Sequence, residues 1–398
     1  MKIIAIITNG TLPLPASMGG AAETLLQTFI DLNEKFNDFK LVIFSMSEDL
    51  AIDMSKSYKN TEYIYINTNS IKYKIKRALR FVINKFIKNK IKNEFISQVC
   101  KYHHRFIEVD GVLIECNINY PKYIKMITNK PVGLHLHNDY LNIQNEKEST
   151  AVIENLDFII CVSSYIKDRV KEVSTISKCN ISTVYNGISL KRFNNFKLED
   201  NIKLKDQLNF LDSDIIIVFA GRLKESKGVK LLIEAFLKLL SSNNVKLLII
   251  GASGFSSSKK TKFIHQIELL TKKAKDKIIF TGYINNEEIH KYYNLADFCV
   301  LPSIATEAFP ITTIEALASS LPVIITDSGG MPEAIDENCG FILKRDSNNL
   351  STDLHNTMNL LLNDKSLLNR MAIAAKKRSI SFSSENYYKA ISTKLKSI

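Results

Sequence analysis

Short apolar runs alternate with segments of helical periodicity along most of the chain. Such runs predict buried strands, and strands that alternate with helices predict parallel α/β sheets. Two series of strands are expected, at Ile3–Ile7, Leu41–Phe44, Gly111–Ile114, Val132–Leu136, Phe158–Val162 and Thr183–Tyr185, and then at Ile215–Ala220, Lys246–Ile250, Ile278–Thr281, Phe298–Leu301 and Pro322–Ile325. A polar, strongly charged stretch separates the two series, which indicates two domains.

The 398 residues therefore predict two doubly wound α/β domains with a cleft between their sheet edges. We place the N-terminal domain at residues 1–190, a linker at 191–214 and the C-terminal domain at 215–375. Residues 376–398 are expected to form a C-terminal helix that packs back on the N-terminal domain.

Two glutamates eight residues apart follow one of the predicted strands. Pro302 ends that strand, and Pro310 stands where a helix can begin, because proline is tolerated in a first turn. Glu307 then lies in the loop at the carboxyl end of the strand, and Glu315 lies about one turn into a helix at Ile311–Ser319. Carboxylates accept hydrogen bonds from sugar hydroxyls, and a helix N-terminus favours a diphosphate. The alternative is a capping glutamate and a surface carboxylate.

Two cations are expected at the same edge of the second sheet. Arg222 follows the strand Ile215–Ala220, and Lys227 directly precedes a helix. Their fixed positive charge can neutralise a diphosphate, as a metal ion does in other sites. A pair of solvated surface cations is the alternative.

In the first half of the chain, two glycines and a histidine follow predicted strands. Gly19 and Gly20 precede a helix at Glu23–Phe36 and let backbone amides approach a phosphate closely. His137 ends its strand, where a neutral imidazole can hydrogen-bond a sugar hydroxyl or a leaving phosphate. His135 lies further in and is expected to be structural. An ordinary loop and a satisfied core histidine are the alternatives.

No sequence motif predicts a metal or cofactor. Asp212-Ser213-Asp214 spells D-x-D, but it precedes its strand, so we expect a surface turn. The spacing offers no His/Cys cluster for a transition metal, no P-loop and no nucleophile elbow. The six cysteines form no C-x-x-C pair, which predicts reduced thiols in a cytoplasmic protein.

The formal charge of +12 is concentrated in one segment. Between Ile71 and Arg105 there are eleven basic residues and one acid, a net charge of 11 − 1 = +10. Apolar residues recur there at helical spacing, so the stretch around Lys72–Lys92 predicts a basic amphipathic helix. It is either a solvated face or a surface for an anionic inner-leaflet membrane or a phosphorylated acceptor. Nucleic acid is not expected. With no run of membrane-spanning length, we expect a cytoplasmic or peripheral membrane protein.

Taken together, these motifs resemble the retaining glycosyltransferases of family 4, which have the GT-B fold of two Rossmann-like domains facing across a cleft. The resemblance covers essentially the whole chain. It rests on Gly19-Gly20 with Glu23, His137, Asn186-Gly187, Gly221-Arg222, Lys227-Gly228, Gly282-Tyr283, Pro302-Ser303, Glu307 with Glu315, and Ser328-Gly329-Gly330-Met331-Pro332-Glu333. The residues His135–Asn138 and Gly251–Ser258 are similar to enzymes that extend lipopolysaccharide core, O-antigen or capsule chains.

The resemblance implies an acceptor-binding N-terminal domain and a C-terminal domain that binds the nucleotide sugar. Arg222 and Lys227 would hold the donor diphosphate, and Gly19-Gly20 would close on it from the other domain. Glu315 would accept the ribose hydroxyls, and the backbone of Tyr283 would lie near the base.

The resemblance also implies a set of contacts to the transferred sugar. Glu307 and the amides of the following loop, at Phe309, Pro310 and Ile311, would hold its hydroxyls. His137 would contact the sugar or the acceptor. Many relatives carry glycine where this chain has Pro310. Proline has no N–H, so that contact is either missing or supplied by Ile311.

The implied reaction moves a hexose, with glucose or N-acetylglucosamine as our expectation, from a nucleotide diphosphate sugar with UDP as the expected nucleotide. The acceptor would be a lipid-linked or polysaccharide chain, the anomeric configuration would be retained and no metal would be required. A GT-B nucleotide-sugar epimerase and a non-catalytic sugar-nucleotide-binding subunit are the alternatives. The sequence does not specify the base, the sugar, the acceptor or the linkage.

Overall fold

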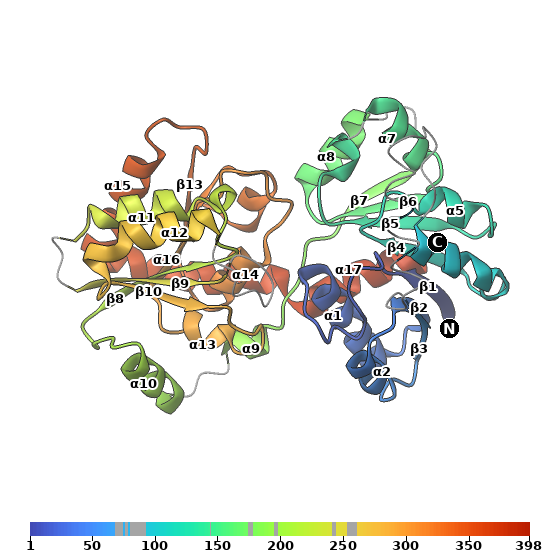
Figure 1. The fold of residues 1–398 in the computed structure, drawn as a ribbon, viewed down its shortest axis with the longest axis horizontal. Helices are drawn as coiled ribbons and strands as arrows, with labels where there is room; N and C mark the ends of the chain where they lie inside the picture. The colour runs from blue at the N-terminus through green and yellow to red at the C-terminus, as the bar shows by residue number, and fades with distance from the viewer. Residues whose placement is uncertain are drawn as a thin grey trace. The chain divides into compact units, whose positions relative to one another are not determined.

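A computed structural model of the chain describes residues 1–67, 75, 79, 93–143, 145–173, 178–194, 198–240, 244–252 and 261–398. These residues form two compact units, Met1–Asn186 with Glu385–Ile398, and Gly187–Ser384. Each unit is built on its own parallel sheet (Figure 1). The basic residues from Lys72 to Lys92 lie outside the described residues, as does most of the stretch Gly251–Ser258.

The first unit holds a seven-stranded parallel sheet in the order β3-β2-β1-β4-β5-β6-β7. Its strands are β1 (Lys2–Ile7), β2 (Phe39–Met46), β3 (Thr61–Ile66), β4 (Gly111–Glu115), β5 (Val132–Leu136), β6 (Phe158–Cys161) and β7 (Asn180–Thr183). The central strands are buried on both faces, which explains their continuous apolar sequence. The strand order reverses between β1 and β4, and open α/β sheets bind ligands at such a switch point.

The helices of the first unit include α1 at its start and α17 from the end of the chain. They are α1 (Ala21–Phe36), α2 (Asp49–Ser55), α4 (Glu94–Val99), the 3₁₀ helix η1 (Cys100–Phe106), α5 (Pro121–Lys125), α6 (Tyr140–Ile143), α7 (Glu146–Ile153), α8 (Ser164–Val173) and α17 (Ser384–Lys396). The ring of Tyr388 on α17 stacks on Phe29 and Phe36 of α1, with centroids 5.2 and 5.1 Å apart. The Tyr388 hydroxyl also donates to Asp38 at 3.0 Å.

The second unit holds a six-stranded parallel sheet in the order β10-β9-β8-β11-β12-β13. Its strands are β8 (Ile215–Ala220), β9 (Val245–Ile250), β10 (Ile278–Gly282), β11 (Phe298–Leu301), β12 (Val323–Thr326) and β13 (Gly340–Leu343). The switch point of this sheet lies between β8 and β11, so the loops after these two strands share one edge.

Helices cover both faces of the second sheet, with α11 and α12 on one face and α13 on the other (Figure 1). The helices are α9 (Leu190–Asn194), α10 (Leu198–Gln207), η2 (Glu225–Lys227), α11 (Val229–Leu237), α12 (Lys262–Leu270), η3 (Thr271–Ala274), α13 (Ile289–Tyr293), α14 (Ile311–Ala318), η4 (Met331–Ala334), α15 (Leu350–Asn363), α16 (Lys365–Ser379) and η5 (Ile380–Phe382).

The structure differs from the predicted domain boundaries in two places. The segment 191–214, predicted as a linker, contains most of α9 and all of α10, and it belongs to the second unit. The buried ring of Phe193 packs there against Tyr293, with centroids 6.3 Å apart, so the segment is part of a core. At the end of the chain, α16 belongs to the second unit, and only Glu385–Ile398 belongs to the first.

Three further expectations concern the D-x-D motif, the cysteines and membrane-spanning helices. Asp212 of the D-x-D motif lies in an exposed turn before β8, as predicted, whereas Asp214 is buried and accepts a hydrogen bond from the amide of Leu211 at 2.8 Å. All six cysteines are free thiols. Within the described ranges, no helix combines the length and apolarity needed to cross a membrane.

Candidate functional site

The loops after β8, β11 and β12 meet at the carboxyl edge of the second sheet. The amides of Ile304 and Ala305 donate to the carbonyl of Ser226, at 3.0 and 3.1 Å. On the other side, the amide of Gly330 donates to the carbonyl of Glu307 at 2.8 Å. The loop that carries Glu307 is therefore held by backbone hydrogen bonds from both neighbouring loops.

Two glycines allow these loops to approach so closely. Gly228 has φ +69°, and a Cβ there would lie 1.9 Å from the carbonyl oxygen of Pro302. Gly329 has φ +56°, and a Cβ there would lie 2.2 Å from the carbonyl oxygen of Glu307. A side chain is excluded at both positions by the backbone conformation and by the available space.

This packing brings Lys227 and Glu307 together. The Lys227 Nζ lies 2.5 Å from Glu307 Oε1, and Ser303 Oγ donates to the same oxygen at 2.5 Å. The side chains of Lys227 and Glu307 keep 23% and 14% of their exposure, so the pair can be reached from solvent. Among the described residues, no hydrogen bond to Glu307 Oε2 is found. The site thus holds a cation and a carboxylate oxygen that are both open to a ligand.

Glu315 lies in the second turn of α14 and is buried, with incomplete hydrogen bonding. Tyr293 donates its hydroxyl to Glu315 Oε2 at 3.4 Å, and a guanidinium nitrogen of Arg192 lies 3.9 Å from Oε1. Both contacts are long for hydrogen bonds. Burial raises the pKa of Glu315, although the Arg192 charge and the Tyr293 hydrogen bond oppose this effect.

The remaining residues predicted for the donor site lie at this edge in different environments. The Arg222 side chain is exposed and makes no hydrogen bond or ion pair with the described residues, and Tyr283 is 47% exposed. Phe309 is buried against Phe382, with centroids 5.4 Å apart, so its ring supports the loop. Pro310 caps α14 and Ile311 begins it.

In the first unit, Gly19 and Gly20 directly precede α1, in the loop after β1. Both have positive φ, +75° and +103°. A Cβ on Gly20 would lie 2.3 Å from Oε2 of Glu23, whose carboxylate is buried in the first turn of α1. Burial raises the pKa of Glu23, and the nearby carboxylate of Glu115 adds to that increase. Gly20 thus leaves room for a buried acidic side chain.

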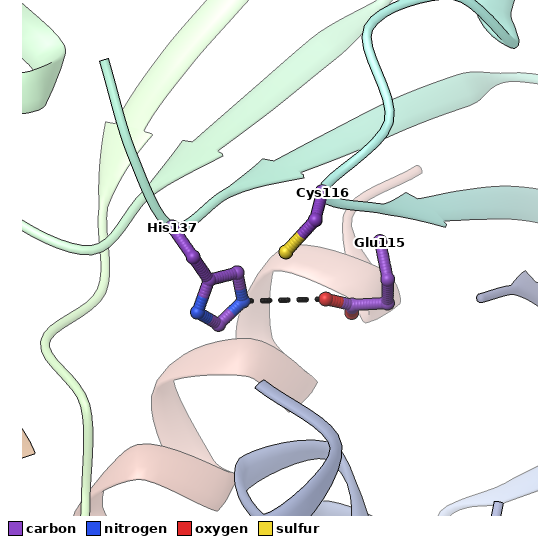
Figure 2. Close-up of side chains that lie close together, drawn as sticks. All are labelled: Glu115, Cys116 and His137. Carbon is purple, nitrogen blue, oxygen red and sulfur yellow. Dashed lines mark hydrogen bonds and ion pairs between the residues drawn. The ribbon is translucent and has the colours of Figure 1, made fainter. Parts of the chain in front are cut away.

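A carboxylate and two imidazoles cluster where β4 and β5 end. Glu115 Oε1 lies 3.2 Å from His135 Nδ1, and Glu115 Oε2 lies 3.3 Å from His137 Nε2. The two ring nitrogens, His135 Nδ1 and His137 Nε2, are themselves 3.2 Å apart. Figure 2 shows Glu115 and His137 facing each other across the ends of neighbouring strands, with the Cys116 side chain beside them. His137 was predicted from the sequence as a site residue, and Glu115 was not.

Burial and the neighbouring imidazoles shift the pKa of Glu115 in opposite directions. Burial would raise the pKa of this carboxyl, but the facing imidazoles of His135 and His137 outweigh it and lower the pKa to about 2. Burial lowers the pKa of His137, an effect that His135 increases and Glu115 opposes. Burial and the Glu115 charge raise the pKa of the Cys116 thiol. The cluster is thus an ionised carboxylate between two imidazoles, next to a neutral thiol.

The expectation that the chain has no His/Cys cluster must be corrected here. Potential ligand atoms of Glu115, Cys116 and His137 all lie within 4.8 Å of one another. Sequence spacing gave no sign of this set, because sheet pairing brings the residues together. The carboxylate already accepts hydrogen bonds and the thiol keeps its proton, so the set is satisfied as a hydrogen-bonded cluster.

Arg192 and Tyr293 were not predicted as site residues. Arg192 falls in the segment interpreted as a linker, and Tyr293 falls in a helix with no motif around it. A buried tyrosine in a polar helical stretch is a weak signal, and only the fold places it beside Glu315.

Comparisons with known proteins agree with this architecture. Residues 200–378 match the family model described as glycosyl transferases group 1. The putative glycosyltransferase YtcC of Bacillus subtilis is 26% identical over 94% of this chain and 86% of its own length. The lipopolysaccharide 1,2-N-acetylglucosaminetransferase of Salmonella typhimurium is 29% identical over 64% of this chain and 63% of its own length.

Among solved structures, Anabaena Alr3699/HepE in complex with UDP superposes with a TM-score of 0.77 at 17% identity, over 100% of both chains. This likeness extends the match from residues 200–378 to the fold of the whole chain. The chain thus has the GT-B fold, and its residues 200–378 are similar to the glycosyl transferases group 1.

Proposed function

We propose that this glycosyltransferase moves a hexose from a nucleotide diphosphate sugar to a lipid-linked or polysaccharide acceptor, with retention of the anomeric configuration. The observation that carries the proposal is the pairing of Lys227 with Glu307 at the switch point of the second sheet. Glu315 lies on the helix that follows the same loop. A cation for the diphosphate and two carboxylates for ring hydroxyls are thus carried by adjoining elements.

In the proposed reaction, the bond between the anomeric carbon and the diphosphate breaks while the acceptor oxygen bonds to the same face of that carbon. The acceptor proton passes to the departing diphosphate. Lys227 and Arg222 would stabilise the negative charge that develops on this leaving group. Glu307 Oε2, which has no hydrogen bond within the described residues, would accept a hydroxyl of the transferred sugar.

We propose UDP as the nucleotide, and glucose or N-acetylglucosamine as the sugar. HepE has been solved with UDP-glucose, and the Salmonella relative is named for transfer of N-acetylglucosamine to lipopolysaccharide. A role in lipopolysaccharide, O-antigen or capsule synthesis is part of the same proposal.

A panel of nucleotide diphosphate sugars tests the donor assignment. Thermal shift identifies the donor that stabilises the chain, since a ligand bound only to the folded state raises the melting temperature. Transfer to an oligosaccharide acceptor, followed by NMR of the new anomeric centre, then tests retention. An inverted product would contradict the proposed stereochemistry, and a donor converted to its epimer without acceptor would favour the epimerase alternative.

We further propose that the basic segment Lys72–Lys92 places the enzyme on an anionic membrane surface. Its support is the sequence alone, through the concentration of positive charge. Liposomes with anionic lipid should retain the wild-type chain and release a variant in which Lys85, Lys88, Lys90 and Lys92 are neutralised. Equal retention of both would contradict the proposal.

A further inference from the structure

The tautomer of His137 can be worked out from its neighbours. Glu115 offers one carboxylate oxygen to each imidazole, at 3.2 Å from His135 Nδ1 and at 3.3 Å from His137 Nε2. An ionised carboxylate only accepts hydrogen bonds, so each facing nitrogen must carry a proton. A ring nitrogen without a proton would point its lone pair at a negatively charged oxygen.

His135 supports the same arrangement. Its side chain is 1% exposed, and its Nε2 is buried without a hydrogen-bond partner. If the proton of neutral His135 were on Nε2, a buried N–H would be left unpaired, which costs more than a bare lone pair. The proton therefore belongs on Nδ1, where Glu115 accepts it, and His135 cannot serve as the acceptor for His137 without losing that bond.

With its proton on Nε2, neutral His137 has a lone pair on Nδ1. This nitrogen is on the side of the ring away from Glu115 (Figure 2). Nδ1 can accept a hydrogen bond but cannot donate one, so it can bind a hydroxyl and cannot bind an unprotonated phosphate oxygen.

We propose that Glu115 is a positioning residue, which fixes His137 in the Nε2–H tautomer so that Nδ1 accepts a hydrogen bond from a hydroxyl of the acceptor. This inference rests on the proposed transferase function for the identity of the hydroxyl. The tautomer itself follows from the geometry of the first unit alone.

Other titratable groups also surround this cluster. Glu23 lies on α1, Cys116 follows Glu115 directly, and Tyr387 on α17 is buried, with Glu115 and Cys116 acting on its ionisation. Burial raises the pKa of each of these three groups, which favours their neutral forms. Glu115 is therefore the charged acceptor that faces both imidazoles.

Long-range ¹H–¹⁵N NMR correlations on histidine-labelled full-length chain measure the tautomer directly. Neutral wild-type His137 should show the Nε2–H pattern. An Nδ1–H pattern would overturn the inference, whatever the enzymatic activity. This measurement needs no variant and no substrate.

Glu115→Gln tests the cause, because the amide can donate as well as accept. The variant should give His137 a mixture of tautomers, whereas Glu23→Gln, which removes a neighbouring buried carboxylate, should keep the wild-type pattern. An unchanged tautomer in Glu115→Gln would overturn the positioning role, and Glu115→Asp should restore part of the wild-type pattern.

Kinetic measurements on the same variant test whether the tautomer matters for the reaction. With the donor found by the panel, Glu115→Gln should lower kcat by roughly ten- to a hundredfold, the size typical of supporting residues. The donor KM should stay within about twofold, because the proposed nucleotide ligands belong to the second unit. A mixed tautomer with unchanged kcat would overturn the hydroxyl contact. An Nε2–H tautomer in a chain that transfers no sugar would overturn the proposed function and leave the tautomer assignment intact.

Discussion

At the scale of the single residue, Glu315 and Lys227 have contacts that contribute little to the stability of the fold. Glu315 is buried with two long contacts, whereas Lys227 is partly exposed and forms a short ion pair with Glu307. A buried carboxylate with poor hydrogen bonding disfavours folding, and a partly exposed ion pair contributes little to it. Both groups are therefore better explained by a ligand than by the fold.

Glu315→Gln should weaken nucleotide binding and stabilise the folded chain. Loss of hydrogen bonds to a charged acceptor predicts affinity reduced roughly ten- to a hundredfold, measurable by calorimetry. Because burial raises the pKa of Glu315 above 4.5, the folded chain holds this proton more tightly than the unfolded chain. The stability difference from wild type should therefore appear as pH rises above 4.5 and vanish below it. A variant less stable than wild type at neutral pH would contradict this explanation.

Lys227→Gln should reduce turnover without unfolding the chain. A lost cation at a leaving group predicts kcat lower by about 10²–10³. The ion pair with Glu307 is partly exposed, so the free energy of unfolding should change by less than about 1 kcal/mol. Chemical denaturation measures stability, and Lys230→Gln on the neighbouring helix α11 is a matched control for turnover. Comparable turnover in the two variants would contradict the role of Lys227.

The sequence predicted these site residues to different extents. Lys227, Glu307 and Glu315 lie in recognisable order after apolar strands, so the sequence predicted that they share one sheet edge. Glu115 is only the last residue of an apolar run, and Arg192 is distant in the sequence from Glu315, the residue whose carboxylate it approaches. Their importance depends on partners that sheet pairing and helix packing bring near.

At the scale of the element, the glycine turns determine whether the loops can meet. Gly228 and Gly329 have positive φ and leave no space for a side chain. The strands that escaped prediction, β3 and β13, each lie at one edge of their sheet. Of the other two edge strands, β10 was predicted closely, and the prediction for β7 overlaps it only at Thr183. An edge strand is buried on fewer sides, so its sequence carries a weaker apolar signal than the central strands. The interior strands were predicted within a few residues for the same reason.

Gly228→Ala should destabilise the second unit and disturb the Lys227 loop. Its Cβ would lie 1.9 Å from a backbone oxygen, so the loops must separate, and we expect a loss of about 2 kcal/mol or more. Gly282→Ala is the matched control, because Gly282 has φ +71° but no atom within 4 Å of the added Cβ. That variant should lose only about 1 kcal/mol from backbone strain. Equal losses in thermal denaturation would show that close approach is not the cause.

At the scale of the whole molecule, the last residues of the chain complete the first unit. The sequence predicted a returning C-terminal helix from residue 376, whereas the boundary between the units follows Ser384. The packing of α17 on α1 depends on stacked aromatic rings, which are apparent only in the folded unit.

Tyr388→Ala should destabilise the first unit by about 3–5 kcal/mol, because it removes a buried ring that stacks on Phe29 and Phe36. Tyr388→Phe keeps the ring and loses the hydrogen bonds that the hydroxyl makes with Asp38 and Asn33, with an expected cost of about 1 kcal/mol. Calorimetry should show the first unit's transition lowered, while nucleotide still stabilises the second unit. If nucleotide no longer stabilised the second unit of the Tyr388→Ala variant, the assignment of Tyr388 and the nucleotide site to separate units would be contradicted.

The central claim is that the edge of the second sheet binds a nucleotide diphosphate sugar through Lys227, Glu307 and Glu315. Titration calorimetry of the intact chain with UDP-glucose and UDP-N-acetylglucosamine tests it most directly, with Glu315→Gln and Lys227→Gln in parallel. We predict saturable binding of at least one donor by wild type and affinity reduced roughly tenfold or more in both variants. Absence of binding to either donor, or equal affinity in all three proteins, would contradict the claim.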